Sequence, residues 1–279
     1  MSRVSIIIPC YNAGELLLES VASALAQTHR DVEVVVVDDG STDPRTVELM
    51  NQIPGPRTRV IRQANGGPSV ARNRAVAAAT GDYILPLDAD DLIDATYVEK
   101  ALARIEADPA VGIVYCDAEK FGAASGRWVL PAYSLREMVI DNVIFCSALY
   151  RKADWVAVGG YNERLRHGME DYEFWIKLLA LGRGVAKIDE PLFRYRIQER
   201  SRTTQFMDDD SSVVATYAEI FRSNTDFFAR HAEFMFEHRF GLYRELDHFK
   251  YRYGRLDAIL EKHAWLKRIA ASFRRLLFK

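Results

Sequence analysis

Several features that this 279-residue sequence lacks exclude whole classes of protein. Its three cysteines, Cys10, Cys116 and Cys146, are widely spaced, so neither a disulfide framework nor a cysteine zinc site is expected. No stretch approaches the ~20 consecutive apolar residues of a membrane-spanning helix. The apolar run Val4–Ile8 is too short for the core of a signal peptide. The sequence therefore predicts a cytoplasmic protein, or one bound peripherally to the inner face of the plasma membrane.

Strong net charge is also missing. The formal charge is -2 at pH 7, whereas nucleic-acid binding usually needs a broad basic surface, so we expect no nucleic-acid partner. A glycine-rich phosphate loop is missing too, because Asn12-Ala13-Gly14 has too few glycines after the first predicted strand. This argues against a nucleotidyltransferase and against a dinucleotide-dependent oxidoreductase.

The first half of the chain alternates apolar runs with segments of helical spacing, which predicts an α/β fold with a mostly parallel sheet flanked by helices. Strands are predicted at Val4–Pro9, Val32–Val37, Arg59–Arg62, Tyr83–Leu87 and Gly112–Cys116. Helices are predicted at Glu15–Ala26, Pro44–Met50, Pro68–Ala79 and Ala95–Ala107. From about Phe206 the pattern becomes helical and rich in aromatic residues, with long segments around Val213–Ala232 and His238–Leu260.

Polar side chains follow three of the predicted strands. Tyr11 comes after the first, Asp38-Asp39-Gly40-Ser41 after the second, and Asp88-Ala89-Asp90 after the fourth. Ligands of open α/β sheets bind beyond the carboxyl ends of the strands, so this edge is a candidate site. Asp88 and Asp90 leave an extended segment on the same side, and paired carboxylates suit Mg²⁺ or Mn²⁺. A solvated turn or a helix N-cap is the alternative, above all for the neighbouring Asp91.

Two further segments have both a structural and a ligand-binding interpretation. Asp38-Asp39-Gly40-Ser41 is an ordinary Asp-Gly turn, yet its adjacent carboxylates need a partner such as the N–H groups of a base. Asn65-Gly66-Gly67-Pro68 leads into a helix whose first amides favour anions. Arg72, within that helix, either reaches a phosphate or base or holds one of the carboxylates.

Four stretches in order resemble the family 2 glycosyltransferases, which have the GT-A fold: VSIIIPCYNAGELLLESVASALAQT, VVVVDDGSTD, NGGPSVARNRAVAAATGDYILPLDADD and GGYNERLRHGMEDYEFWIKLLALG. The resemblance runs from about Val4 to Thr203. It implies inverting transfer of a sugar, usually from a UDP-sugar. We accordingly expect a GT-A domain over residues 1–204, with a nucleotide-binding half (1–118) and an acceptor half (119–204), and a C-terminal helical region over 205–279.

The resemblance also implies a role for individual residues. Tyr11 would stack on the base, Asp39 would bind the base N–H, and Asp90 would bind the metal. Asp88 would touch the ribose or the metal. The remaining residues that we place at the nucleotide sugar are Pro9, Asn65, Arg72 and Ala89.

Glu170-Asp171 is similar to the acidic pair of that family, in which the aspartate is the general base and the glutamate holds the acceptor. Neighbouring residues on a helix point about 100° apart, so the two side chains should do different jobs. The adjacent carboxylate would raise the pKa of a base, while the helix N-terminus would lower it. The sequence leaves open which effect is larger.

The segment Tyr195-Arg196-Ile197-Gln198-Glu199-Arg200-Ser201 departs from the family pattern YRxHxxS, because Gln198 stands where relatives have a histidine near the metal. A glutamine oxygen is a weaker metal ligand. This substitution keeps an alternative open, namely a nucleotide-sugar-binding protein with weakened catalysis.

The acceptor side carries less information. Trp128, Tyr133, Cys146, His167 and Trp175 are placed there by their position in the chain. The resemblance suggests a glycan or lipid-linked acceptor and a role in bacterial surface polysaccharide synthesis. Residues 262–279 have an apolar face and several basic residues, which fits either an anionic membrane surface or packing on the protein itself or on a partner copy.

Overall fold

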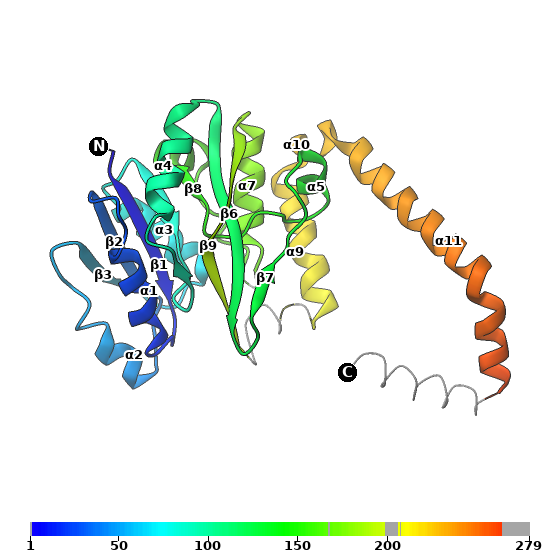
Figure 1. Cartoon of the computed structure of the whole chain (residues 1–279), viewed down its shortest axis with the longest axis horizontal. Coiled ribbons are helices and arrows are strands. Elements are labelled where there is room, and N and C mark those ends of the chain that lie inside the picture. The colour runs from blue at the N-terminus through cyan, green and yellow to red at the C-terminus, as the bar shows by residue number, and fades with distance from the viewer. Residues whose placement is uncertain (1, 167, 199–205, 207, 264–279) are drawn as a thin grey trace. The chain divides into compact units, whose positions relative to one another are not determined.

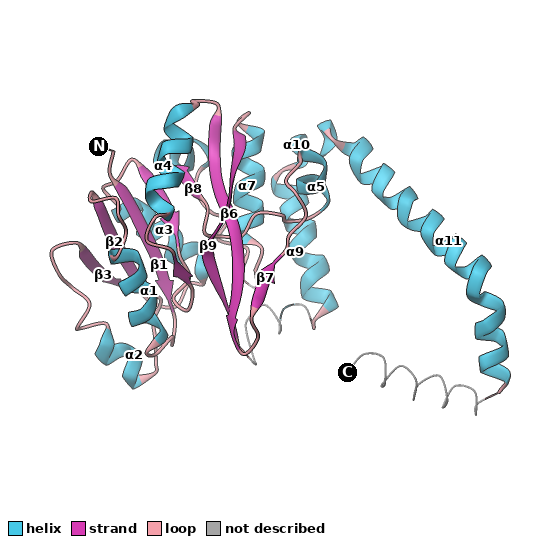
Figure 2. Cartoon of the chain, in the orientation of Figure 1, coloured by secondary structure: helices cyan, strands magenta, loops and turns pink. Residues whose placement is uncertain are grey.

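The computed structural model describes residues 2–166, 168–198, 206 and 208–263. The chain divides into two compact units, Met1–Arg230 and His231–Lys279. The first unit therefore includes two helices that the sequence analysis placed in the C-terminal helical region. Figures 1 and 2 show its strands flanked by helices on both faces of the sheet.

The N-terminal part of the first unit is a parallel βα arrangement. Its elements are β1 (Val4–Cys10), α1 (Leu16–Leu25), β2 (Val32–Asp38), α2 (Pro44–Leu49), β3 (Thr58–Arg62), α3 (Pro68–Ala78) and β4 (Tyr83–Pro86). Strand β1 pairs in parallel with β2 and β4, and β2 pairs in parallel with β3. Apolar side chains fill β1 and β2 almost without interruption, because both faces of these strands are covered. The strands and helices predicted for this half are confirmed.

The rest of the first unit is mixed. It contains β5 (Leu92–Ile93), α4 (Tyr97–Ala107), β6 (Val111–Gly122), β7 (Gly126–Trp128), α5 (Leu135–Ile140), β8 (Leu149–Arg151), α6 (Lys152–Val158), α7 (Glu170–Ala180) and β9 (Gly184–Ile197). The sheet order is β3-β2-β1-β4-β8-β6-β9-β5, with β7 paired to β6. Strands β8, β7 and β5 run antiparallel to their neighbours, so the sheet is parallel over β1–β4 and mixed beyond them.

Helices make up the remaining described chain. Helix α9 (Asp210–Ser223) and helix α10 (Thr225–Arg230) end the first unit, and α11 (Ala232–Lys262) forms the second. The predicted helix over Val213–Ala232 is broken at Asn224, whose side chain bonds to Glu173 of α7. No described helix is both long and apolar enough to cross a membrane. Residues 264–279, most of the predicted amphipathic tail, lie outside the described residues.

Candidate active site

A pocket of about 610 Å³ opens at the carboxyl ends of β1, β2 and β4; we call it the strand-end pocket. It brings together eight residues that the sequence analysis assigned to the nucleotide sugar or the metal: Pro9, Tyr11, Asp39, Asn65, Asp88, Ala89, Asp90 and Gln198. Tyr11 is 52% exposed there, so one face of its ring is accessible to a flat ligand. Arg72, Glu170 and Asp171 do not line this pocket.

Asp39 is held at the pocket by the loop before α3. Its Oδ1 accepts hydrogen bonds from Gln63 Nε2 (2.7 Å) and from the Gly66 amide (2.8 Å), and its Oδ2 accepts one from the Gly67 amide (2.9 Å). The amides that could have bound an anionic ligand are thus used by a carboxylate of the protein itself. Because a carboxylate oxygen accepts two hydrogen bonds, Oδ2 retains capacity for one more donor.

The neighbouring Asp38 has a structural role. Its Oδ1 accepts a hydrogen bond from the Ser41 amide (2.9 Å), and the turn continues through Gly40 at φ 76°. A Cβ atom at Gly40 would lie 2.7 Å from the Asn65 amide nitrogen, so only glycine allows the two loops to approach this closely. The turn interpretation therefore holds for Asp38, whereas Asp39 faces the pocket.

Arg72 joins the two halves of the first unit. The residue is 1% exposed, and its Nη2 lies 2.6 Å from Asp88 Oδ1 while its Nη1 donates to Glu170 Oε1. Burial alone would lower the pKa of this guanidinium, but the charges of Asp88 and Glu170 raise it well above its usual value. Of the two alternatives for Arg72, the structure shows the one in which it holds carboxylates.

Glu170 and Asp171 begin α7 in different surroundings. Glu170 is 3% exposed and bound to Arg72, so its expected contact with an acceptor stays a prediction. Asp171 is half-buried, and its Oδ2 accepts a hydrogen bond from Asn142 Nδ2 at 3.2 Å. Burial, followed by the charge of Glu170, raises the pKa of Asp171 to about 6. The pKa is therefore raised mainly by burial, which the sequence analysis did not consider, and the charge of Glu170 acts in the same direction.

The pair Asp88 and Asp90 fits a hard divalent cation. Burial, followed by the charge of Asp88, raises the pKa of Asp90, and a cation between the two carboxylates would remove that repulsion. Gln198 Nε2 donates to Asp90 Oδ2 at 2.5 Å, so the residue that replaces the family histidine does contact the expected metal ligand. Among the described residues no group of three His, Cys, Asp or Glu side chains forms a metal cluster. Two carboxylates completed by substrate phosphates are, however, a common way to hold Mg²⁺.

Asp91 is a structural residue that sequence reasoning left as a turn or cap. It is fully buried, and its Oδ1 accepts a hydrogen bond from the Arg196 amide of β9 at 2.8 Å. Arg196 Nε in turn donates to the Asp90 backbone carbonyl at 2.7 Å. These contacts tie the acidic loop after β4 to the strand that carries Gln198.

Arg166 and Tyr195 are among the pocket residues that the sequence analysis did not assign to the site. Arg166, an exposed side chain in the loop before α7, lines the strand-end pocket and adds a cation to its lining. Tyr195 lines the same pocket, and its ring centroid is 4.6 Å from that of Trp128. The one sequence signal for Arg166 is its position shortly before Glu170-Asp171. No local pattern in the sequence predicts that the loop before α7 reaches the strand ends.

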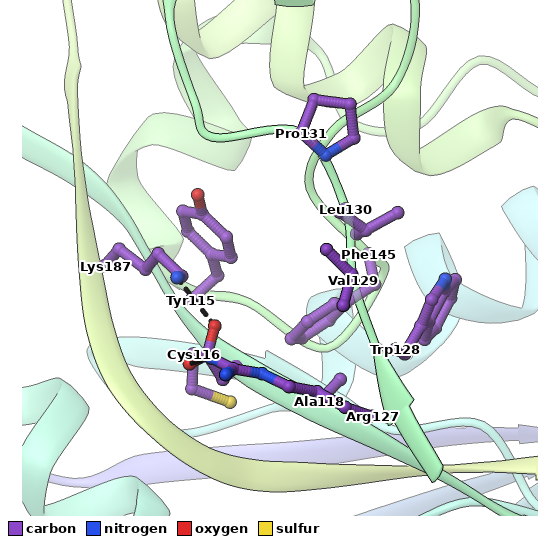
Figure 3. A pocket seen from close by; sticks show the side chains of 11 residues that line it. Tyr115, Cys116, Ala118, Arg127, Trp128, Val129, Leu130, Pro131, Phe145 and Lys187 are labelled. Atoms are coloured by element: carbon purple, nitrogen blue, oxygen red, sulfur yellow. Dashed lines mark hydrogen bonds and ion pairs between the residues drawn. The ribbon is translucent and has the colours of Figure 1, made fainter. Parts of the chain in front are cut away.

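A second cavity, of about 230 Å³, has Trp128 in its lining (Figure 3); we call it the side cavity. Asp117 sits in its wall between Lys187 and Arg127, each 2.6 Å away. Mostly apolar and aromatic residues complete the lining: Tyr115, Cys116, Ala118, Trp128, Val129, Leu130, Pro131 and Phe145. Of the residues predicted on the acceptor side, Trp128 lines this cavity and Cys146 lies 3.5 Å from Asp88 Oδ2. Trp175 is buried in the core, and His167 lies outside the described residues.

Comparison with known proteins supports this arrangement. A profile described as glycosyl transferase family 2 matches residues 5–153, more than half of the chain. Chondroitin synthase from Pasteurella multocida (strain Pm70) is 34% identical over 188 residues, which is 64% of this chain and 19% of that protein. The chain spans about a fifth to a quarter of the length of the curated synthases that it matches.

Solved structures confirm the GT-A-like fold. TarS 1–349 of S. aureus, in complex with UDP-GlcNAc, aligns with a TM-score of 0.61 at 22% identity, covering 83% of this chain and 73% of that one. The mannosyltransferase PcManGT from Pyrobaculum calidifontis, in complex with GDP-Man and Mn²⁺, also gives 0.61, at 20% identity, covering 79% of this chain and 64% of that one.

Replacing Arg72 should destabilise the first unit strongly. Arg72→Met leaves Asp88 and the buried Glu170 without their shared cation, so we expect the free energy of unfolding to fall by about 3–5 kcal/mol. Arg74→Met, on an exposed position of the same helix, should change it by no more than ~0.5 kcal/mol. Urea denaturation followed by circular dichroism measures both; equal, small losses would contradict the bridging role.

Proposed function

This chain belongs to glycosyl transferase family 2, and from that membership we propose that it is an inverting, metal-dependent glycosyltransferase. It would move a sugar from a nucleotide-diphosphate donor, a UDP-sugar in the first instance, to a hydroxyl group of a glycan or lipid-linked acceptor. The observation that carries the proposal is the strand-end pocket, in which the exposed ring of Tyr11, the carboxylate of Asp39 and the carboxylate pair Asp88 and Asp90 line one cavity.

Donor binding would use the two ends of this pocket. Tyr11 offers a ring face to the base, and Asp39 Oδ2 has capacity for one base N–H donor. Arg166 would pair with the diphosphate, because it is the cation that the pocket lining supplies. The solved neighbours named above were crystallised with UDP-GlcNAc and GDP-Man, which supports a nucleotide-sugar donor without choosing the base or the sugar.

Asp88 and Asp90 would hold the Mg²⁺ or Mn²⁺ ion, and a bound ion would offset the negative charge that develops on the diphosphate leaving group. Asp88 can do so through Oδ2, since its Oδ1 is bound to Arg72. To bind the metal itself, Gln198 would have to rotate its side-chain amide, because in the structure it presents its N–H group rather than its oxygen to Asp90. It therefore acts in this proposal as a support for Asp90.

Asp171 would take the proton from the acceptor hydroxyl. A carboxylate with a pKa of about 6 is a stronger base than an ordinary aspartate and is still mostly ionised at pH 7. Arg72 fixes Glu170 one residue away, and Asn142 orients the Asp171 carboxylate. Direct attack from the face opposite the leaving group needs no covalent enzyme intermediate, in keeping with inversion.

The acceptor half would bind the growing glycan. The side cavity combines apolar walls with the Asp117–Lys187 pair, the mixture that sugar rings require of a binding site. The chondroitin synthase relative supports a polysaccharide acceptor. A lipid-linked acceptor would suit a peripheral position on the inner face of the plasma membrane.

The first test concerns the metal. Asp90→Ala should abolish transfer and remove the Mn²⁺ dependence of UDP binding, because it deletes the proposed ligand. Asp82→Ala, an exposed position at the other end of β4, should keep both properties. Isothermal titration calorimetry measures the affinity of each variant for UDP in the presence of Mn²⁺ and in the presence of EDTA. An Asp90→Ala variant that still binds UDP more tightly with Mn²⁺ would show that another residue is the metal ligand.

The second test concerns the base. Asp171→Asn should keep the fold and UDP affinity while turnover falls by about 10²-fold or more. In the unmodified protein the active form is the ionised one, so kcat/KM should be level above pH 6 and fall about tenfold per unit below it. Normal turnover in the variant would exclude Asp171 as the base. Donor binding with no turnover in the unmodified chain would instead support the weakened, nucleotide-sugar-binding alternative.

A further inference from the structure

Helix α11 (Ala232–Lys262) presents large apolar side chains that are exposed, with no other described element of its unit covering them. Leu242, Leu246 and Phe249 are 53%, 47% and 54% exposed. At 1.5 Å per residue, a helix of 31 residues is about 46 Å long. The exposed apolar residues from Phe236 to Tyr253 extend over about 26 Å of that length. An apolar surface of this extent along one helix is typical of an interaction surface rather than of an ordinary solvent-facing helix.

Six residues of α11 are spaced as in a heptad pattern, while Phe236, Phe240 and Tyr243 are similarly exposed beside this stripe at e and b positions. Met235, Arg239, Leu242, Leu246, Phe249 and Tyr253 are separated alternately by four and three positions, and five of these six are apolar. An average spacing of 3.5 residues keeps one stripe facing a second helix as the two wind around each other. In heptad notation Leu246 is an a position and Leu242 and Phe249 are d positions.

The charges beside this stripe favour another copy of the same helix. Glu245 is a g position and Lys250 the following e position, so in a parallel, in-register pair Glu245 of each copy meets Lys250 of the other. Arg239 is the one charged residue in the stripe, and its guanidinium lies over the ring of Tyr243. A polar residue at a single a position is a known determinant of register in such pairs.

An anionic membrane is a poorer partner for this segment. Between Ala232 and Gly254 the helix carries equal numbers of acidic and basic residues: Glu233, Glu237, Glu245 and Asp247 against Arg239, Arg244, Lys250 and Arg252. Membrane-surface helices gain attraction from a basic polar face, and a balanced one gains none. We therefore infer that α11 forms a parallel, in-register coiled coil with α11 of a second copy of this chain.

Sedimentation equilibrium of the full chain tests the association. The expected mass is twice the 31.8 kDa of one chain at low micromolar concentration. Leu246→Lys should raise the dimer dissociation constant at least tenfold, whereas Tyr251→Lys, at an outward f position that is 89% exposed, should leave it unchanged. Glu245→Lys and Lys250→Glu should each weaken the dimer, and the double variant should restore it.

Cysteine cross-linking tests orientation and register. Leu242→Cys should form an interchain disulfide on mild oxidation, since d positions face their own equivalents only in a parallel, in-register pair; Tyr251→Cys should not. A chain that stays monomeric at ~100 μM, or that floats with anionic vesicles as a monomer, overturns the inference. So does a dimer that survives Leu246→Lys, or one in which Leu242→Cys fails to cross-link.

Discussion

A guanidinium that cannot reach water has to be neutralised by carboxylates held in fixed positions, and the candidate site depends on one such group. Arg72 of α3 binds Asp88 after β4 and Glu170 at the start of α7, so it joins the donor half of the sheet to the acceptor half. With Glu170 fixed in this way, the next residue of the helix points in a different direction. That residue, Asp171, is left half-buried with a raised pKa.

Pairing of charges within the protein also explains the arrangement at the donor end of the strand-end pocket. The glycine amides before α3 bind Asp39 and are therefore not available to a phosphate. A helix start that generally attracts anionic ligands thereby holds Asp39, the carboxylate that we propose binds the base. The cation for the diphosphate then has to come from elsewhere, and Arg166 together with a metal at Asp88 and Asp90 would supply it in the proposed mechanism.

The sequence predicted those features that depend on local pattern. Continuous apolar runs predicted β1, β2 and β4, and the polar residues directly after these strands predicted the positions of Tyr11, Asp39, Asp88 and Asp90 at the pocket. Contacts between distant segments could not be predicted in this way. The hydrogen bond from the Arg196 amide to buried Asp91 joins residues more than a hundred positions apart. Strand β8, which is antiparallel, is three residues long and leaves no clear pattern in the sequence. Arg166 lies at the pocket only because the fold brings its loop there.

The bridge at Arg72 can be observed directly by NMR of the arginine side chains, with Arg72→Lys used to assign the signals. If Arg72 is clamped by two carboxylates, its guanidinium N–H groups should give separate, slowly exchanging resonances that remain visible at neutral pH. The exposed Arg74 should give averaged, rapidly exchanging signals under the same conditions. An Arg72 guanidinium that rotates and exchanges as fast as that of Arg74 would contradict the account.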